Sequence, residues 1–443
     1  MSVRSRAMLG VAISLLAVGC PQASGAQSPS DPAEAPLTLR TAAAEALRAN
    51  PELRAARDAI DAARGRLVQA GLWPNPELGL SGSSDFAFAN EGERELSVGV
   101  AQPFPIASRL ARARDVARVD VELAMAEARD FERTLVAEVE RSVMSLLALQ
   151  RTVAARERVI EVVRELVRVS ARRLEAAQVS EADLNLLEID LARLEQERRL
   201  VELERVTETV RLKRLLYRPP EAPVELAGDV EERVFVPLLA AELSQAAIDR
   251  RPDLAGLRLE SERARAEAAL ARAEAWEDWA VEARFDRTHS AIDDAGLDLR
   301  DRDELLGLAV RVPFPLFNRN QGRIAEALAL ERRAGSRLAS LERAVLAEVE
   351  SARKRVEELD RVAREYRERL VPRSERNVEL LGRGYREGLS PISDLLQAEQ
   401  QLADASLGWV RTLGELRQAE IDLEAAAAAS PLLGLDASQE ERP

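Results

Sequence analysis

Hydrophobic residues along this chain follow two periods, and short stretches of one lead into long stretches of the other. Between 306 and 312 every second residue is Leu or Val, and those between are small or charged: Leu306, Gly307, Leu308, Ala309, Val310, Arg311 and Val312. A period of two is typical of a strand with one apolar face. Pro313 and Pro315 are expected to end the strand, because proline cannot donate a ladder hydrogen bond. A charged helical pattern follows, with Asn318 as its expected N-cap, and continues to about residue 387.

The same order of patterns occurs twice. Asn50-Pro51 corresponds to Arg251-Pro252, 201 residues later, whereas two other landmark pairs are 210 residues apart. These pairs are Pro103-Phe104-Pro105 with Pro313-Phe314-Pro315, and Gln178-Val179-Ser180 with Gly388-Leu389-Ser390. The nine extra residues are expected in a long loop between the two strands of the second half, near 290–303. We therefore divide the chain into a first repeat (37–228), a second repeat (229–430) and a C-terminal tail (431–443).

Each repeat predicts a short helix, a longer helix, two strands, a very long helix and a return helix. The expected elements are 39–49, 52–72, 77–88, 95–102, 106–177 and 181–217, then 240–250, 253–276, 279–288, 305–312, 318–387 and 391–429. The very long helix would measure about 105 Å, and the return and pre-strand helices about 57 Å and about 30 Å. The two shorter helices can therefore stack end to end beside the long one. The strands then lie at one end of a cylinder and the helix turns at the other.

The strands are long enough to cross a bilayer at a tilt, at about 8 to 12 residues each. Four strands cannot close on themselves, and lipid does not tolerate open sheet edges. Three copies supply twelve strands, which can close, and their helices would continue the closed sheet as a helical tube. The predicted fold class is mainly α with a small β part, in a threefold-symmetric assembly.

Composition and charge narrow the function. Of the 443 residues, 32% are charged and 3% aromatic, which favours long packed helices over several ordinary domains. The net charge of −14 speaks against a nucleic-acid partner. The sequence has no glycine-rich phosphate loop, no Cys/His cluster and no nucleophile beside a base, so we predict no enzyme. His289, the single histidine, has Asp293 and Asp294 nearby, but this set is too weak to predict a metal site.

The N-terminus resembles a bacterial lipoprotein signal. Two arginines precede an apolar core at 8–18, which is too short to span a membrane, and a small residue stands directly before Cys20, the only cysteine. We predict a signal peptide at 1–19, lipid on Cys20 and a flexible tether at 20–36. The alternative is ordinary cleavage slightly later, with Cys20 as a bystander. No later stretch approaches the roughly 18 consecutive apolar residues of a membrane helix.

Taken together, the landmarks resemble the TolC family of outer-membrane efflux channels. The resemblance runs from 37 to about 429 and rests on the Asn50-Pro51 and Arg251-Pro252 helix stops, the paired Pro-Phe-Pro landmarks, and the stretches at 314–327 and 388–398. It implies a trimeric twelve-stranded membrane β-barrel continued by a long periplasmic α-helical barrel. It also implies an exit duct of a tripartite, RND-type efflux system, with a periplasmic adaptor (membrane fusion) protein and an inner-membrane RND transporter as partners.

The resemblance carries further expectations. The stretch 318–322 is most similar to the subgroup that serves heavy-metal cation exporters, so metal cations are the first expected substrate and drugs or other solutes the second. The location it implies is the outer membrane, with outer-membrane lipid as a neighbour and no cofactor apart from the lipid on Cys20. The alternative from another class is a periplasmic coiled-coil structural lipoprotein without a pore.

The resemblance also assigns residues. The helix turns would contact the adaptor: Gln178, Val179, Ser180, Gly388, Leu389 and Ser390. Asp394 would ring the periplasmic gate, and Gln397 stands where some family members carry a second aspartate. The alternatives are structural: Gly388 supplies a left-handed turn, Ser180 and Ser390 cap the return helices, and Asp394 complements a helix dipole.

Two further features stay open in the sequence. Trp73 and Trp276, near the strand starts, are interfacial aromatics or packing residues where helix meets strand. Pro372 should kink or locally break the second long helix, whereas Val162, at the matching position of the first, should not.

Overall fold

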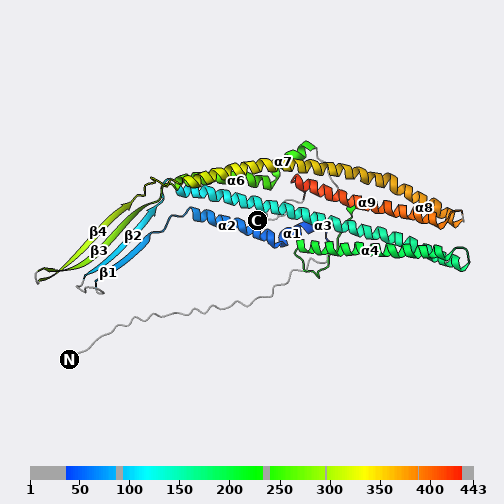
Figure 1. Ribbon diagram of the computed structural model, residues 1–443, viewed down its shortest axis with the longest axis horizontal. Helices are drawn as coiled ribbons and strands as arrows, with labels where there is room; N and C mark the ends of the chain where they lie inside the picture. Colours follow the sequence, from blue (N-terminus) through cyan, green and yellow to red (C-terminus); the bar gives the residue numbers. More distant parts are fainter. Residues whose placement is uncertain (1–35, 86–92, 233–239, 295–296, 388, 432–443) are drawn as a thin grey trace, which may run out of the picture.

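The computed structural model describes residues 36–85, 93–232, 240–294, 297–387 and 389–431. The predicted signal peptide, Cys20, most of the tether, Gly388 and nearly all of the C-terminal tail lie outside these residues. The described chain is elongated, with one antiparallel sheet at one end and long helices running away from it (Figure 1).

The predicted elements occur twice in the same order. The first set is α1 (Leu39–Ala49), α2 (Pro51–Ala70), β1 (Glu77–Ser84), β2 (Arg94–Phe104), α3 (Arg109–Glu175) and α4 (Glu181–Leu215). The second is α5 (Ala240–Arg250), α6 (Pro252–Ala273), β3 (Trp279–Asp294), β4 (Leu297–Arg311), α7 (Gln321–Glu365), η3 (Tyr366–Leu370), α8 (Val371–Arg386) and α9 (Ile392–Ala426). A 3₁₀ turn, η2 (Val230–Glu232), lies near the junction of the two sets.

The two sets join through hydrogen-bonded strands. The sheet has the order β1-β2-β3-β4, and β2 pairs with β3 from Arg94↔His289 to Phe104↔Trp279. One hairpin therefore comes from each half of the chain, and the middle pair of strands links the halves.

The short helices stack beside the long ones, as the lengths predict. In Figure 1, α2, α1 and α4 follow one another along α3, while α6 and α9 lie along the α7–α8 helix. Asn50 makes the break between α1 and α2: its buried Oδ1 accepts hydrogen bonds from the backbone N–H groups of Glu52 at 2.9 Å and Leu53 at 3.2 Å. Pro51 then occupies the first turn of α2, where a missing N–H costs nothing.

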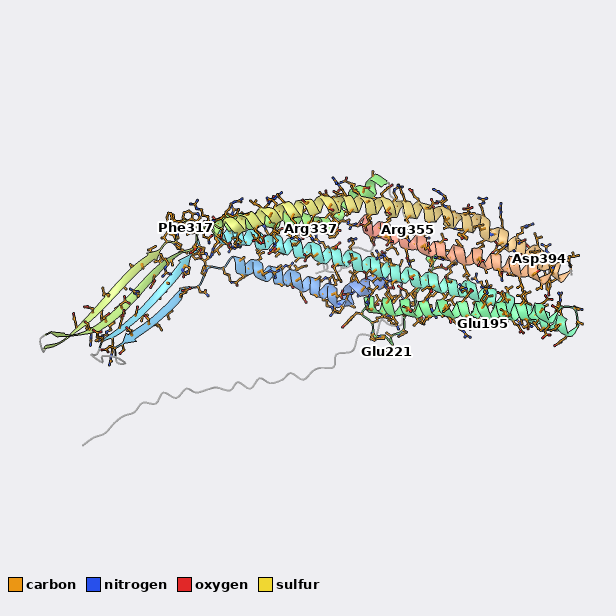
Figure 2. All side chains as sticks on the ribbon, viewed as in Figure 1. Glu195, Glu221, Phe317, Arg337, Arg355 and Asp394 are labelled. Atoms are coloured by element: carbon orange, nitrogen blue, oxygen red, sulfur yellow. The ribbon has the colours of Figure 1, made fainter. Side chains whose placement is uncertain are left out.

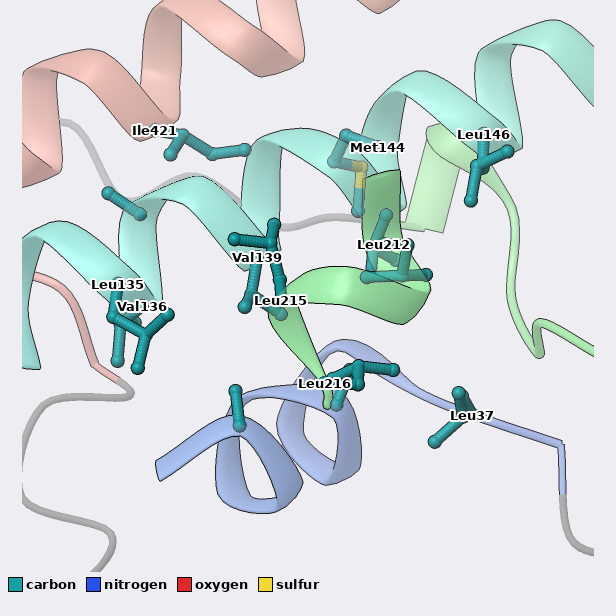
Figure 3. Close-up of a cluster of buried hydrophobic side chains, with 14 of the residues drawn as sticks. Leu37, Leu135, Val136, Val139, Met144, Leu146, Leu212, Leu215, Leu216 and Ile421 are labelled. Carbon is teal, nitrogen blue, oxygen red and sulfur yellow. The ribbon is translucent and has the colours of Figure 1, made fainter. Parts of the chain in front are cut away.

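The largest apolar core lies where the short helices meet the long ones, midway along the molecule. Figure 3 shows Val139 and Met144 of α3, Leu212 of α4, Leu216 just after it, and Ile421 of α9 gathered in this core, all of them 2% exposed or less. Burial of such side chains contributes about 1.5–3 kcal/mol each. A second core around Val345, Val349 and Leu423 repeats the arrangement in the other half.

Three sequence predictions need correction. The long loop expected at 290–303 is mostly strand, because β3 runs to Asp294 and β4 starts at Leu297. Asn318 is not the N-cap of α7: the helix starts after Asn320, whose side-chain amide donates to Ala271 O at 3.1 Å, while Asn318 Oδ1 accepts from Asn320 N. Ser390 does not cap α9, whose N-cap is Pro391.

Pro372 breaks the regular helix locally, as predicted, without ending it. The preceding segment, Tyr366–Leu370, is a π-helical turn in which the N–H of Val371 donates to Tyr366 O, five residues earlier. A π turn is one way to keep backbone groups paired where proline interrupts the α-helical ladder. The first long helix, α3, passes Val162 without interruption.

Candidate functional sites

One face of the sheet is apolar along most of its length. With the observed register, alternate residues of all four strands form this face: Leu78, Leu80, Leu96, Val98, Val100, Val281, Ala283, Phe285, Leu306, Leu308 and Val310. Leu306 and Leu308 are 76% and 78% exposed in the single chain. A continuous exposed apolar surface of this kind marks contact with lipid or another protein. Within the described residues, no helix has the length and apolarity to cross a membrane.

The opposite face of the sheet is small and polar. Ser81, Ser97 and Asp286 form one row across it, and the Ser97 hydroxyl donates to the Asp286 carboxylate at 2.5 Å. Arg284 Nε lies 2.9 Å from the same carboxylate. Leu305 is an exception on this face and is 61% exposed. The strands thus alternate apolar and polar, the pattern of a sheet with lipid on one side and water on the other.

The helical end of the apolar face carries a collar of aromatic rings. Trp73 packs edge-on against Phe104, with ring centroids 6.0 Å apart, and Trp276 packs in the same way on Phe314 at 5.9 Å. The two tryptophans are still 60% and 41% exposed, so each one packs and faces solvent or lipid at once. Phe317, at the same junction (Figure 2), is 90% exposed.

The apolar face has the height of a bilayer core. Along β3, ten residue steps separate Trp279, next to the collar, from His289, whose row is the first on this face without an apolar side chain; Arg287 and Glu304 lie one row nearer the collar. Ten steps of about 3.3 Å give about 33 Å along the strand, or about 25 Å across a membrane at a tilt of about 40°.

At the opposite end of the molecule, the α3–α4 turn is closed by its own polar groups. Ala177 takes the left-handed conformation, with φ of 53°, so Gln178 does not need it. Ser180 caps α4: its Oγ accepts from the N–H of Asp183 at 3.2 Å, and the Asp183 carboxylate accepts from the N–H of Ser180 at 3.1 Å. The capping expected for Ser180 is confirmed, and Gln178 remains exposed on the turn.

In the α8–α9 turn, the backbone after the turn lies close to Gly384 near the end of α8. The N–H groups of Leu389 and Ser390 both point at Gly384 O, at 2.7 and 3.3 Å. A Cβ added to Gly384 would lie 2.5 Å from Ser390 Oγ, so this position has no room for a side chain. Leu389 is 78% exposed at the tip. The structure thus places five of the six predicted contact residues on two neighbouring tips, and the sixth, Gly388, lies outside the described residues.

Asp394 lies in the first turn of α9, close to the tip and far from the sheet (Figure 2). Its carboxylate is exposed and accepts a hydrogen bond from the Ser393 hydroxyl at 3.2 Å. Gln397, one helical turn later, is also exposed. Asp394 and Gln397 therefore share a solvent-facing side of α9, whereas Leu395 and Leu396 between them are buried.

A small apolar cluster holds the two helical hairpins together near their tips. Leu187 of α4 packs against Tyr385 of α8 and against Leu395 and Leu396 of α9. The guanidinium of Arg173 lies 4.5 Å above the Tyr385 ring, a further contact between the hairpins. The sequence pattern did not predict this cluster, because it depends on which faces of distant helices meet.

Between the same hairpins lies a cavity of about 260 Å³, which the sequence also did not predict. Its walls come from α3, α4 and α9 and mix apolar with charged groups. Asp190, buried to 9% exposure, binds Arg193 at 2.7 Å, and this hydrogen bond raises the pKa of Arg193. Glu399 also lines the cavity, and burial raises the pKa of its carboxyl group.

Other candidates give no site. His289 lies inside β3, not in a loop, with Arg94 and Arg302 as its cross-strand partners. Two cationic neighbours disfavour a metal ion there. Among the residues that the structure describes, no group of three or more His, Cys, Asp or Glu side chains could hold a metal.

The π turn meets α9 at a glycine. The ring of Tyr366 occupies the space that a side chain at Gly408 would need, since a Cβ there would lie 2.8 Å from the tyrosine hydroxyl. The extra width of the π turn and the missing side chain of Gly408 thus fit together where α7 gives way to α8.

Known proteins are similar to this chain in sequence and in fold. Residues 42–216 and 243–429 match the family described as outer membrane efflux protein, one match in each repeat. The chain is 23% identical over 427 residues to the cobalt-zinc-cadmium resistance protein CzcC of Cupriavidus metallidurans, covering 94% of this chain and 97% of that protein. It is similar in fold to crystal structures of CusC (TM-score 0.73, 17% identity, 88% of this chain and 91% of that one). It is also similar to the outer membrane protein VceC of Vibrio cholerae (TM-score 0.70, 18% identity, 88% and 95%).

Proposed function

Because this chain belongs to the outer membrane efflux protein family, we propose that three copies form the outer-membrane exit channel of a tripartite, RND-type efflux system. Their strands would close as a twelve-stranded barrel in the membrane, and their helices would continue it into the periplasm. The channel would carry out no covalent chemistry and would pass solutes from the pump and adaptor to the outside.

The observation that carries this proposal is the two-faced sheet. An apolar face with Leu308 at 78% exposure is costly in water, at about 25 cal/mol for each Å² of apolar surface left uncovered. Lipid removes that cost, and the polar face with Ser97, Arg284 and Asp286 suits a water-filled lumen. A periplasmic spacer without a pore, the alternative, has no use for four strands that alternate in this way.

The tips and α9 carry the proposed contacts and gate. The turns at 178–180 and 389–390 lie at the end opposite the sheet, where an adaptor reaching up from the inner membrane would meet them. Asp394, exposed just behind the second tip, would form a ring of three carboxylates in the trimer, with Gln397 one turn further on. Such a ring favours cations in a narrow pore.

The substrate we propose is a metal cation. The support is the likeness to a cobalt-zinc-cadmium resistance protein over 94% of the chain, together with the hydroxyl and carboxylate oxygens that Ser81, Ser97 and Asp286 bring to the polar face. Drugs or other small solutes are the second candidate. Lipid on Cys20 would hold each copy to the membrane and would leave the channel itself unchanged.

Single-channel conductance in planar bilayers tests the proposal. The wild type is compared with Asp394→Ala and with Glu181→Ala, which removes an exposed first-turn acid from the other tip. We expect discrete steps from the wild type, larger or longer openings from Asp394→Ala, and wild-type behaviour from Glu181→Ala. Steps that ignore Asp394→Ala keep the channel and move the gate elsewhere. A folded wild-type preparation without steps favours the structural spacer.

A further inference from the structure

The outer end of the apolar face carries a row of basic side chains. Arg94 of β2, His289 of β3 and Arg302 of β4 are direct cross-strand partners, so they lie side by side on one face. By the alternation of the strands, this is the face of Leu96, Phe285 and Leu306. We name Arg94, His289 and Arg302 the basic row.

Near this end of the sheet, the basic row lies on the apolar face and the acidic residues next to it along the strands lie on the polar face. Glu95 and Asp303, the neighbours of Arg94 and Arg302 along their strands, point to the polar face. In the part of the chain that the structure describes, no carboxylate lies within ion-pair distance of Arg94 or Arg302. The basic row therefore leaves positive charge uncompensated on the face that also carries the exposed leucines.

The next row inward is basic as well, with one acid. Arg287 lies between Leu96 and Glu304 on the apolar face, and its Nε is 3.3 Å from Glu304 Oε1. That nitrogen is buried and makes no well-aligned hydrogen bond, so the contact with Glu304 is an ion pair of poor geometry. A hollow of about 500 Å³ lies at this end of the sheet, and residues of both faces line it: Ser84, Arg94, Leu96, Arg287 and His289 of the apolar face, and Ser83 and Glu95 of the polar face.

The position of the basic row decides what it would meet. This step rests on the proposed function, in which the apolar face contacts lipid and the helices lie in the periplasm. The basic row then lies about 25 Å from the aromatic collar, at the height where acyl chains end and head groups begin in the outer leaflet. Long arginine side chains can also lie along apolar surface and carry their charge to that boundary.

We infer that Arg94, His289 and Arg302 form a docking surface for phosphate-bearing anionic lipid head groups of the outer leaflet. Guanidinium groups bind phosphate oxygens in pairs, which suits a head group with more than one phosphate spread over neighbouring strands. Apolar side chains directly below the row would hold the acyl chains of the same lipid. A free anion in solution would gain from the charge alone and not from Leu96 or Phe285.

Lipid-dependent thermal stability tests this inference. The purified trimer in neutral detergent is melted alone, with diphosphorylated lipid A, with its monophosphorylated form of matched acyl chains, and with inorganic phosphate. We expect the diphosphorylated lipid to raise the Tm of the wild type by about 3 °C or more at saturation. We expect a smaller rise from the monophosphorylated lipid and none from inorganic phosphate. Lipid molecules counted by native mass spectrometry should follow the same order.

The variants assign the effect to the basic row. Arg94→Gln/Arg302→Gln should lose at least half of the rise in Tm. Arg94→Lys/Arg302→Lys keeps the charge without the paired N–H donors, so its rise should lie between those of the glutamine variant and the wild type. The matched control, Arg284→Gln/Arg311→Gln, removes two positive charges from the polar face of the same sheet and should respond to lipid like the wild type.

Three results would overturn the inference. They are equal rises with the two lipids, a rise of the same size with inorganic phosphate, and an unchanged response of Arg94→Gln/Arg302→Gln. Each preparation is also tested for conductance steps. A wild type that conducts but ignores lipid phosphates contradicts this inference alone, whereas a wild type that never conducts contradicts the proposed channel.

Discussion

An arginine introduced on one face of the sheet or on the other tests which face contacts lipid and which contacts water. Leu308 and Ala309 are neighbours on β4, but Leu308 lies on the apolar face opposite Ala283, and Ala309 lies on the polar face opposite Glu282. The substitutions Leu308→Arg and Ala309→Arg add the same charge to the same strand at nearly the same height. Only the medium that the new side chain meets is different.

The expected cost follows from the depth of each position. Ala283, the partner of Leu308, is four residues from Trp279 and six from His289, so Leu308 lies near the middle of the apolar band. An arginine at the midplane of a membrane strand costs about 2–4 kcal/mol, or about 30- to 1,000-fold in the equilibrium for insertion of each chain. Three copies in one channel multiply this effect. Ala309→Arg should cost nothing and gains a cross-strand ion pair with Glu282 worth about 0.2–1 kcal/mol.

The assay is insertion of urea-unfolded protein into phosphatidylcholine vesicles. The measured quantity is the fraction that migrates as an unheated, detergent-resistant trimer. Leu308→Arg should fall below about a tenth of the wild-type yield, whereas Ala309→Arg should match the wild type. Circular dichroism checks that the helices form in both variants, because the change lies outside them. Equal yields from the two variants would refute the assignment of the faces, and with it the membrane position of the sheet.

Two further predictions concern the helices. Arg251 is 6% exposed and binds Asp253 at 2.7 Å, Glu348 at 2.8 Å and Ala426 O at 3.1 Å. Arg251→Ala leaves a half-buried carboxylate unpaired and should cost about 3–5 kcal/mol, which lowers the Tm of a chain of this length by about 4 °C. Burial alone would raise the pKa of Asp253, but the hydrogen bonds and charge of Arg251 hold this pKa below its usual value. The resulting stabilisation is present above the unfolded-state pKa and is lost as pH falls through the folded-state pKa. The difference in Tm between the wild type and Arg251→Ala should therefore become smaller in acid. The control Arg337→Ala, at an exposed 3.6 Å pair with Glu260, should change Tm little, and a similar loss from both variants would contradict the reasoning. Burial raises the folded-state pKa of Glu399, so its ionised carboxylate destabilises the fold at pH 8, and Glu399→Gln removes this charge. The variant should therefore be more stable than the wild type at pH 8. The difference in stability should vanish as pH falls below the unfolded-state pKa. A pH-independent difference in Tm between Glu399→Gln and the wild type would show that packing, not ionisation, is responsible.

The fold followed from the sequence where a local pattern decides the structure. The alternation at 306–312 predicted not only a strand but also which residues share its apolar face, because the side-chain period of a strand is two. Asn50-Pro51 predicted the break between α1 and α2, since the cap and the proline act within a few residues. The duplication then extended each of these predictions to the other half of the chain.

Other features depend on contacts between distant segments and could not be predicted. Asn320 replaces Asn318 as the start of α7 because its side chain reaches Ala271 on another helix. Pro372 predicted an irregularity, but its form as a π turn goes together with the fit of Tyr366 against Gly408. The charged residues after Ser290 were interpreted as a loop, because they lack the apolar alternation seen from Leu306 to Val312.

The candidate functional sites also include some features that the sequence predicted and others that it could not. The two tips were predicted by the repeat, and the structure places Gln178 and Leu389 there as exposed residues. Their contact with an adaptor and the gating role of Asp394 stay predictions. The cavity beside Glu399 and the cluster around Tyr385 lay beyond sequence reasoning, since their residues come from three or four helices.

The unequal hairpins leave part of one strand exposed in the proposed assembly. β4 has 15 residues and β1 has 8, so in a closed ring at least seven residues of β4 find no strand in the next copy to pair with. A free strand edge is a template for sheet growth between separate particles. Six of the seven residues from 298 to 304 are charged, Asp298, Arg300, Asp301, Arg302, Asp303 and Glu304. In the proposed assembly, this density of charge on the rim would discourage channels from adhering edge to edge, so the same residues that lengthen the hairpin would keep densely packed channels apart.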